Sequence, residues 1–495
     1  MRPETVARPN SGVFGLILGL VLGVLLASVI LPARQDTTVI GADSRGAPRG
    51  TEASDAPEEA LAAGEAAGVD GPVASAPSGA PTARPDGSSG ARRATGSSSS
   101  GTRGAANVRG VTDDSIKVGV VYLDLGALKQ LGPRFNIGDV KKQWEAVYDR
   151  WKRENVVPVH GRDIKFVFRT FDAIRSDTQR PACVSMTEDE KVFAVVAVAY
   201  FAIGSECVAR EYKTPLITLD GPTEEVMKRS HPFLFTLTPT EDSVLKNWIR
   251  WAHHNGTLTG KKIGIYRPAD QAGADLVSRA VKAELAKLGY KVAVEVAQND
   301  DSSDALAVQR FKSTGVDLAL LVVAGKGGFL QQADAQGYKP KYIDSDYQFG
   351  TSDTAASGYS PDQWDGVQGM TARRVGEFNA GRQPDASQEA CLANYERYAG
   401  VKLQRTDNSE TAYVLTTCDE AEVLMHGLKA VGPDLDHARY VAGLETIRAL
   451  PLRRVPSISY TSTKHHGSEQ QRTVVWRRSC ACWHAQGNFG PLWTE

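Results

Sequence analysis

The sequence predicts an α/β protein with two doubly wound parallel-sheet lobes, which follow an N-terminal transmembrane helix and a disordered linker. The first observation is a regular alternation of short apolar runs and amphipathic stretches from residue 110 to residue 495. Such alternation is typical of parallel sheets covered by helices on both faces. The second is length, because the roughly 390 residues of this region are too many for one such core and suit two.

Buried strands are expected where a short apolar run is bounded by turn residues. These runs are 115–122, 164–171, 192–198 and 215–219 in the first set, and 262–266, 291–296, 318–323 and 341–343 in the second. Helices are expected between them. The stretch 140–154 places Trp144, Val147 and Trp151 at three- and four-residue spacing, hence on one face. The other helical stretches are 207–212, 273–288 and 303–312.

A break near residues 237–242 separates the two sets of strands. We therefore expect lobe 1 to comprise residues 110–239, completed by about 372–455. Lobe 2 is expected to comprise residues 240–371, completed by about 456–495.

An uncharged run, VFGLILGLVLGVLLASVIL, occupies residues 13–31. A helix of this length reaches about 28 Å, close to the ~30 Å hydrocarbon thickness of a bilayer. We expect residues 13–32 to be a transmembrane anchor, with residues 1–12 as a cytoplasmic tail; a cleaved signal is the alternative. The chain is then a single-pass protein of the cell membrane, with its globular domain extracytoplasmic.

Two further features belong to this N-terminal region. Gly15, Gly19 and Gly23 line one stripe of the expected helix and would allow a homodimer, although glycine is also simply common in membrane helices. Residues 33–108 are rich in Ala, Gly, Ser and Pro and contain no aromatic residue and no cysteine. Such a segment cannot bury enough apolar surface to fold, so a disordered linker is expected.

The charge and the cysteines limit the classes of partner and site. The formal net charge is −1, which gives no electrostatic reason to expect a nucleic-acid partner. Six cysteines in an exported domain indicate disulfides, and of fifteen pairings we expect the one that joins sequence neighbours: Cys183–Cys207, Cys391–Cys418 and Cys480–Cys482. A zinc site at Cys480, Cys482 and His484 is the alternative for the last pair, but it has too few ligands. No metal and no cofactor are expected.

Several motifs, taken in order, resemble one known family. They are GVTDDSIKVGV at 110–120, TPLIT at 214–218, FLFTLT at 233–238, KIGIY at 262–266 and GY at 337–338. Their order and spacing resemble the type I periplasmic-binding proteins, in the branched-chain amino-acid/amide class of ABC transporter substrate-binding proteins. Cys183 and Cys207 stand where that class often has a first-lobe disulfide. The chain departs from the class at Thr236, where an Arg is usual.

The resemblance implies a clamshell that holds a small molecule between its lobes, at loops that follow the strands. The loops are 200–205, 220–223, 324–327 and 344–347, together with the end of the first strand. The residues expected to contact the ligand are Tyr122, Tyr200, Phe201, Ser205, Asp220, Thr223, Ala324, Lys326, Ser345, Asp346 and Tyr347. Asp346 stands where the class has an acid that grips an ammonium group.

Other readings of these residues stay open. Tyr200 and Phe201 replace a Ser/Thr cluster and Ala272 replaces an aromatic residue, which favours an apolar or planar ligand over an α-amino acid. Tyr200 and Phe201 are alternatively core residues. Asp344 and Asp346 are alternatively helix or turn caps. Lys326 is alternatively a solvated loop charge.

The sequence therefore predicts a membrane-tethered solute-binding protein that delivers a small molecule to an ABC permease. The ligand is expected to be an amino acid, an amide or a small aromatic or apolar compound. The alternative is a ligand-silent or sensory clamshell that acts through protein–protein contacts. No nucleophile elbow, zinc-protease or phosphate-binding motif appears, so an enzyme is not expected.

Overall fold

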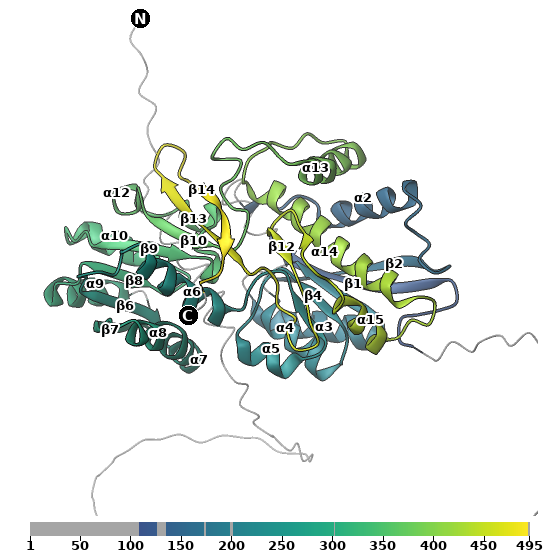
Figure 1. The fold of residues 1–495 in the computed structure, drawn as a ribbon, viewed down its shortest axis with the longest axis horizontal. Helices are drawn as coiled ribbons and strands as arrows, with labels where there is room; N and C mark the ends of the chain where they lie inside the picture. Colours follow the sequence, from purple (N-terminus) through teal and green to yellow (C-terminus); the bar gives the residue numbers. More distant parts are fainter. Residues whose placement is uncertain (1–107, 126–134, 173–174, 199–200, 301, 494–495) are drawn as a thin grey trace, which may run out of the picture. The chain divides into compact units, whose positions relative to one another are not determined.

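The computed structural model describes residues 108–495 except 126–134, 173–174, 199–200, 301 and 494–495 (Figure 1). The predicted anchor with its Gly15, Gly19 and Gly23 stripe, the linker and Tyr200 lie outside the described residues. Within the described part of the chain, no helix combines the length and the apolar character that crossing a membrane requires.

The first sheet has five parallel strands in the order β2-β1-β3-β4-β5. Its strands are β1 (Ser115–Asp124), β2 (Asp163–Asp172), β3 (Ala194–Val198), β4 (Leu216–Thr218) and β5 (Leu234–Thr236). Side chains alternate between two cores: Val120 packs on one face of the sheet and Val121 on the other. This period of two explains the continuous apolar runs of these strands, which are buried on both sides.

Helices from two distant parts of the sequence cover the first sheet. One face carries α3 (Gln179–Val184, continued by π-helical η4, Ser185–Asp189) and α4 (Ala202–Glu206, continued by π-helical η5, Cys207–Glu211), with α5 (Glu224–Ser230) beside α4 and η5; 3₁₀ turn η3 (Ser176–Thr178) precedes α3. The other face carries α2 (Val140–Arg153), α13 (Ala386–Ala399), α14 (Ser409–Val431) and α15 (His437–Leu444). Trp144 of α2 is fully buried there, as its helical spacing predicts. We call this unit the first lobe.

The second sheet has seven strands in the order β14-β13-β10-β9-β8-β6-β7. They are β6 (Ile263–Pro268), β7 (Val292–Gln298), β8 (Leu318–Leu321), β9 (Lys341–Ser345), β10 (Gln368–Thr371), β13 (Gln470–Arg477) and β14 (Cys482–Pro491). Its helices are α6 (Glu241–His254), α7 (Gln271–Leu276), π-helical η6 (Val277–Lys282), α8 (Ala283–Lys287), α9 (Ser302–Thr314), α10 (Gly327–Ala335), 3₁₀ turn η7 (Tyr347–Phe349), α11 (Asp353–Ala356) and α12 (Pro361–Trp364). We call this unit the second lobe.

The predicted α/β fold with parallel-sheet lobes is confirmed, with one addition. The hairpin β13–β14 pairs antiparallel with β10 and with itself, so the second sheet is mixed. An antiparallel edge on an otherwise parallel sheet is common in folds of this kind. A further two-stranded ribbon is formed by β11 (Leu450–Pro451) and β12 (Ser457–Ile458).

The chain crosses between the lobes three times. The first crossover joins β5 to α6, the second joins β10 to α13, and the third joins β12 to β13. Backbone hydrogen bonds tie the first to the third: Gly467 N–H donates to the carbonyl of Thr238 (3.2 Å) and Ser468 N–H to that of Leu237 (3.1 Å). The second is tied to the segment before β12, because Arg374 N–H donates to the carbonyl of Arg454 (2.7 Å).

All three predicted disulfides are confirmed. Cys183–Cys207 and Cys391–Cys418 lie in the core of the first lobe and link helices that cover its sheet. Cys480–Cys482 lies at the turn of the β13–β14 hairpin. Its sulfurs are bonded to each other, which corrects the alternative of a zinc site for this pair.

Candidate ligand site between the lobes

A small cavity of about 60 Å³ lies where loops of both lobes meet the first crossover. It is lined by Asp220, Gly221, Thr238, Pro239, Glu241, Val244, Asp346, Tyr347, Gln348, Phe349 and Arg373. Asp220 and Gly221 follow β4, whereas residues 346–349 follow β9. The cavity therefore lies at the carboxyl ends of strands from both sheets, which is the usual ligand position in open α/β folds.

Helix caps and one close approach of the backbone position the first-lobe loop. Thr223 caps α5 by accepting a hydrogen bond from Val226 N–H, and Thr240 caps α6 in the same way from Ser243 N–H. Gly221 N–H donates to Oγ1 of Thr238 (2.9 Å). A Cβ at Gly221 would lie 2.2 Å from the carbonyl oxygen of Pro239, so the loop packs on the crossover only because residue 221 has no side chain.

The structure shows Asp346 held by its own lobe. Its carboxylate accepts hydrogen bonds from Thr371 Oγ1 (2.7 Å), from Ala372 N–H (2.7 Å) and from Thr351 Oγ1, and lies 3.4 Å from Nη2 of Arg373. The Asp346 side chain is only 6% exposed. Asp346 thus fixes the loop and Arg373 at the edge of the cavity, while its oxygens are already occupied by the protein.

Glu241, which the sequence did not single out, is an acid of the cavity with a raised pKa. Its carboxylate accepts a hydrogen bond from Nε2 of Gln348 (3.1 Å). Burial, with the charges of Asp242 and Asp220, raises the pKa of Glu241 to about 8. Glu241 is therefore mostly protonated at neutral pH when the cavity holds no cation.

Glu420, a second acid with a raised pKa, interacts with Asp220 of the cavity lining. Glu420 of α14 is fully buried. Burial, then Asp220 and Asp419, raise the pKa of Glu420 well above its ordinary value. With Glu241 protonated, the lining still holds Asp220 and Asp346 against one arginine, Arg373, so it favours positive charge.

Four first-lobe residues predicted at the site are not among those that line the cavity. Phe201 is 2% exposed and packs against Phe171 in the core, with ring centroids 5.2 Å apart. Ser205 is buried and donates to the carbonyl of Phe201. Thr223 is a helix cap, and Tyr122 is a half-buried residue within β1. The core reading of Phe201 is therefore the one that its position supports.

Three second-lobe residues predicted at the site are also outside the cavity lining. Lys326 is 2% exposed and pairs with Asp344 at 2.5 Å, so it is not a solvated loop charge. Ser345 is buried and its Oγ accepts a hydrogen bond from Tyr347 N–H. Ala324 is half-buried. Of the predicted residues, the cavity brings together Asp220, Asp346 and Tyr347.

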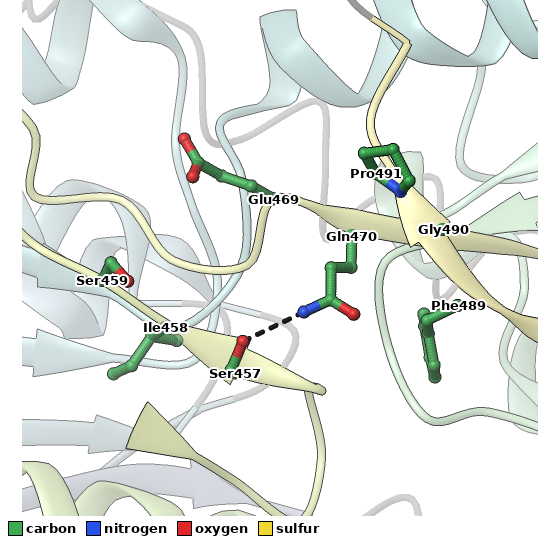
Figure 2. Close-up of a pocket in the computed structure, with 8 residues that line it drawn as sticks. All are labelled: Ser457, Ile458, Ser459, Glu469, Gln470, Phe489, Gly490 and Pro491. Carbon is green, nitrogen blue, oxygen red and sulfur yellow. Dashed lines mark hydrogen bonds between the residues drawn. The ribbon is translucent and has the colours of Figure 1, made fainter. Parts of the chain in front are cut away.

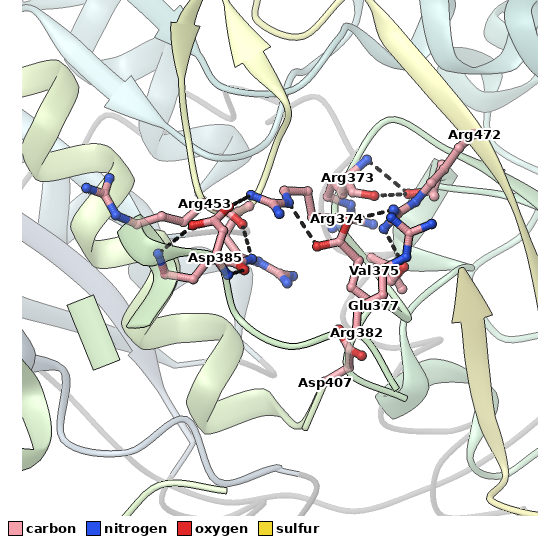
Figure 3. A network of polar contacts seen from close by, with 12 residues as sticks. Arg373, Arg374, Val375, Glu377, Arg382, Asp385, Asp407, Arg453 and Arg472 are labelled. Atoms are coloured by element: carbon pink, nitrogen blue, oxygen red, sulfur yellow. Dashed lines mark hydrogen bonds and ion pairs between the residues drawn. The ribbon is translucent and has the colours of Figure 1, made fainter. Parts of the chain in front are cut away.

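A network of ion pairs links the crossovers next to the cavity (Figure 3). Arg472 of β13 donates to Glu377 (2.6 Å) and to the carbonyl of Val375 (3.0 Å), and its side chain is fully buried. Arg374 bridges Glu377 (2.9 Å) and Asp385 (2.6 Å). Burial opposes ionisation of Glu377, but Arg472 and Arg374 outweigh it and lower its pKa. This network connects the second crossover to the β13–β14 hairpin, which follows the third crossover.

A larger cavity, of about 440 Å³, lies between the ribbon strand β12 and the ends of β13 and β14 (Figure 2). Nε2 of Gln470 donates to Oγ of Ser457 across it (3.0 Å), and Ile458, Phe489 and Pro491 supply its apolar side. No predicted site residue lines it, and its lining comes from β12, β13, β14 and the residues next to them rather than from the loops that follow the parallel strands of both sheets. We therefore place the candidate site at the smaller cavity.

Comparisons with known proteins agree with this architecture. The family profile described as "Periplasmic binding protein" matches residues 115–480. The chain belongs to this family. Its structural relatives include a solute-binding protein of an ABC transporter from Rhodopseudomonas palustris BisB5 in complex with 3,4-dihydroxybenzoic acid (18% identity, 77% of this chain and 98% of the other covered, TM-score 0.56).

Two further relatives show the same fold at similar distance. They are a branched-chain amino-acid ABC transporter protein from Thermus thermophilus with bound valine (14% identity, 76% and 97% covered, TM-score 0.57) and a type 1 periplasmic binding protein from Bordetella pertussis Tohama I (14%, 76% and 100%, TM-score 0.58). A search of curated proteins finds no match. The chain is thus a periplasmic binding protein, and its domain is extracytoplasmic.

Proposed function

We propose that this periplasmic binding protein is tethered to the membrane, captures a small molecule that carries a cationic group, and delivers it to an ABC-type transporter. The observation that carries the proposal is the cavity lined by both lobes and the first crossover. A ligand there touches both lobes at once, so it stabilises the conformation in which they meet.

The charge of the lining supports a cationic ligand. Asp220, Glu241 and Asp346 line the cavity, and the positive charge of Arg373 is balanced by Asp346. A ligand ammonium or guanidinium group near Asp220 would favour the ionised form of Glu241, which would release its proton to solvent and accept a charge-assisted hydrogen bond from the ligand. A lone carboxylate, as in a hydroxybenzoate, would meet like charge.

We expect cationic compounds to raise the melting temperature of the purified chain. At a hundred times its dissociation constant a ligand adds about 2.7 kcal/mol to the free energy of unfolding. The panel compares amines, guanidinium compounds, amino acids, sugars, purines and hydroxybenzoates.

Asp220→Asn should weaken the binding of the best ligand by about 1.5–3 kcal/mol. Asp275→Asn, on the exposed face of α7, is the control and should leave the binding unchanged. A shift by hydroxybenzoates alone would contradict the cationic class, and no shift by any compound would favour the ligand-silent alternative.

Binding of a guanidinium or quaternary ammonium ligand should strengthen as pH rises from 6 to 9. Such ligands keep their charge over this range, whereas Glu241, with a pKa of about 8, becomes the better partner once ionised. In the absence of ligand, the raised pKa means that Glu241 stabilises the fold fully below pH ~4.5 and that this stability declines as pH rises through 8. Calorimetric titrations at several pH values test the binding trend. The rise should disappear in Glu241→Gln, and an equal rise in that variant would contradict the role of Glu241.

A further inference from the structure

The turn of the β13–β14 hairpin carries a disulfide unlike the other two of this protein. Cys480 and Ala481 are exposed, whereas all four cysteines of the other two disulfides are buried: Cys183, Cys207 and Cys391 are at most 1% exposed, and Cys418, like Cys482, is 7% exposed. The two cysteines of the hairpin are two positions apart, against separations of 24 and 27 for the buried pairs. An incoming thiol can therefore reach this disulfide in the folded protein.

Basic side chains surround this disulfide. Nε2 of His484 lies 3.3 Å from Sγ of Cys480. Arg477 is the cross-strand partner of Cys482, and Arg478 is exposed beside it. Burial, and then Arg477, lower the pKa of His484, so its ring is neutral at pH 7 and can accept a proton. Nearby arginine side chains, and a neutral histidine that takes up the thiol proton, favour the thiolate form of cysteine, which is the reactive form.

The size of the closed loop points in the same direction. In the chain-entropy model a disulfide stabilises the fold more when it closes a longer loop. A loop of three residues adds less to the stability of the fold than loops of 25 or 28 residues, roughly 20-fold less in the folding equilibrium constant. Opening the hairpin disulfide therefore costs the fold less than opening either buried pair.

The geometry points to a thiol–disulfide exchange site at Cys480, Cys482 and His484, which accepts two electrons from a dithiol. One thiolate of the dithiol attacks Sγ of Cys480, the S–S bond breaks, and its electron pair goes to Sγ of Cys482, which takes up a proton. The second thiol of the dithiol gives its proton to His484. The thiolate that results attacks the first sulfur of the dithiol, which is bonded to Sγ of Cys480 in the mixed disulfide. Cys480 leaves as a thiolate beside the protonated His484, and the dithiol is oxidised to a disulfide.

Redox titration of the purified chain tests the exchange site. The protein is equilibrated in oxidised and reduced dithiothreitol at set ratios, quenched with acid, alkylated and mapped by mass spectrometry. We expect Cys480–Cys482 to open at a ratio at least ~10-fold more oxidising than the ratio that opens either buried pair, which are internal controls. A hairpin disulfide that stays closed until the buried pairs open would overturn the proposal.

The role of His484 is tested on a single thiol. In Cys482→Ser, the rate at which iodoacetamide alkylates Cys480 is measured against pH. We expect an apparent pKa below the ~8.5 of an ordinary cysteine, and a return toward ~8.5 when His484→Gln is added. His254→Gln, on a distant helix, is the matched control and should leave the profile unchanged. Identical profiles with and without His484 would refute its role as the base.

Discussion

Glu377→Gln should lower the free energy of unfolding by about 3–5 kcal/mol, the range for removing one partner of a buried ion pair. The substitution keeps the shape of the side chain but leaves the fully buried guanidinium of Arg472 without its counter-charge. The carbonyl of Val375 still accepts a hydrogen bond from Arg472, but it carries no charge. Urea titration at pH 7 measures the loss.

The matched control is a surface pair. Glu211 pairs with Arg180 at 2.9 Å, but both side chains are largely exposed, so Glu211→Gln should cost less than about 1 kcal/mol. The dependence of stability on pH provides a second test of the Glu377 ion pair. Because the two arginines hold the pKa of Glu377 below its ordinary value, its contribution is complete above pH ~4.5 and is lost as pH falls through the lowered pKa. The difference between the wild type and Glu377→Gln should therefore shrink below pH 4, and a difference independent of pH would contradict the assignment.

Most of the parallel framework could be predicted because its signals are local. Each strand of the first sheet except β5 lies within or beside an expected apolar run, and the helix 140–154 appears as α2. The disulfide pairing could also be predicted, since each bond joins two cysteines that are nearest neighbours in the sequence. These features depend on a few consecutive residues and need no knowledge of distant partners.

The β13–β14 hairpin was not predicted, because its sequence gives a weak periodic signal. β14 reads CWHAQGNFGP, in which polar and small residues interrupt any alternation. Its position depends on long-range pairing of β13 with β10, which no local pattern encodes. The helices α13 to α15 were likewise not resolved from the sequence, although they complete the core of the first lobe.

The candidate site was predicted only in part for a similar reason. The loops after β4 and β9 were expected at the cleft, and Asp220, Asp346 and Tyr347 do line the cavity. What the sequence could not show is which charges neutralise one another: Lys326 and Asp344 are 18 positions apart and form a closed buried pair. Arg373 and Glu241 line the cavity because the second and first crossovers place them there. The adjacent arginines after β10 were the one signal for Arg373.

Gly467→Ala should destabilise the chain by about 2–3 kcal/mol or more, because a methyl group has no room at this crossover. A Cβ there would lie 1.9 Å from the carbonyl oxygen of Leu237, and that atom belongs to the backbone of the first crossover. A flexible side chain could rotate away, but this backbone is also held by Ser468 N–H at Leu237 and by Gly467 N–H at Thr238. Relief therefore requires the first and third crossovers to separate.

The same separation would move the first crossover, whose Thr238 and Pro239 line the cavity. Gly467→Ala should therefore weaken ligand binding as well as stability, although residue 467 does not line the cavity. Gly490→Ala is the matched control, since a Cβ in that extended segment meets no atom within 4 Å. Urea titration and calorimetry on both variants separate the outcomes. If Gly467→Ala unfolds and binds like Gly490→Ala, the two crossovers are not coupled through this contact.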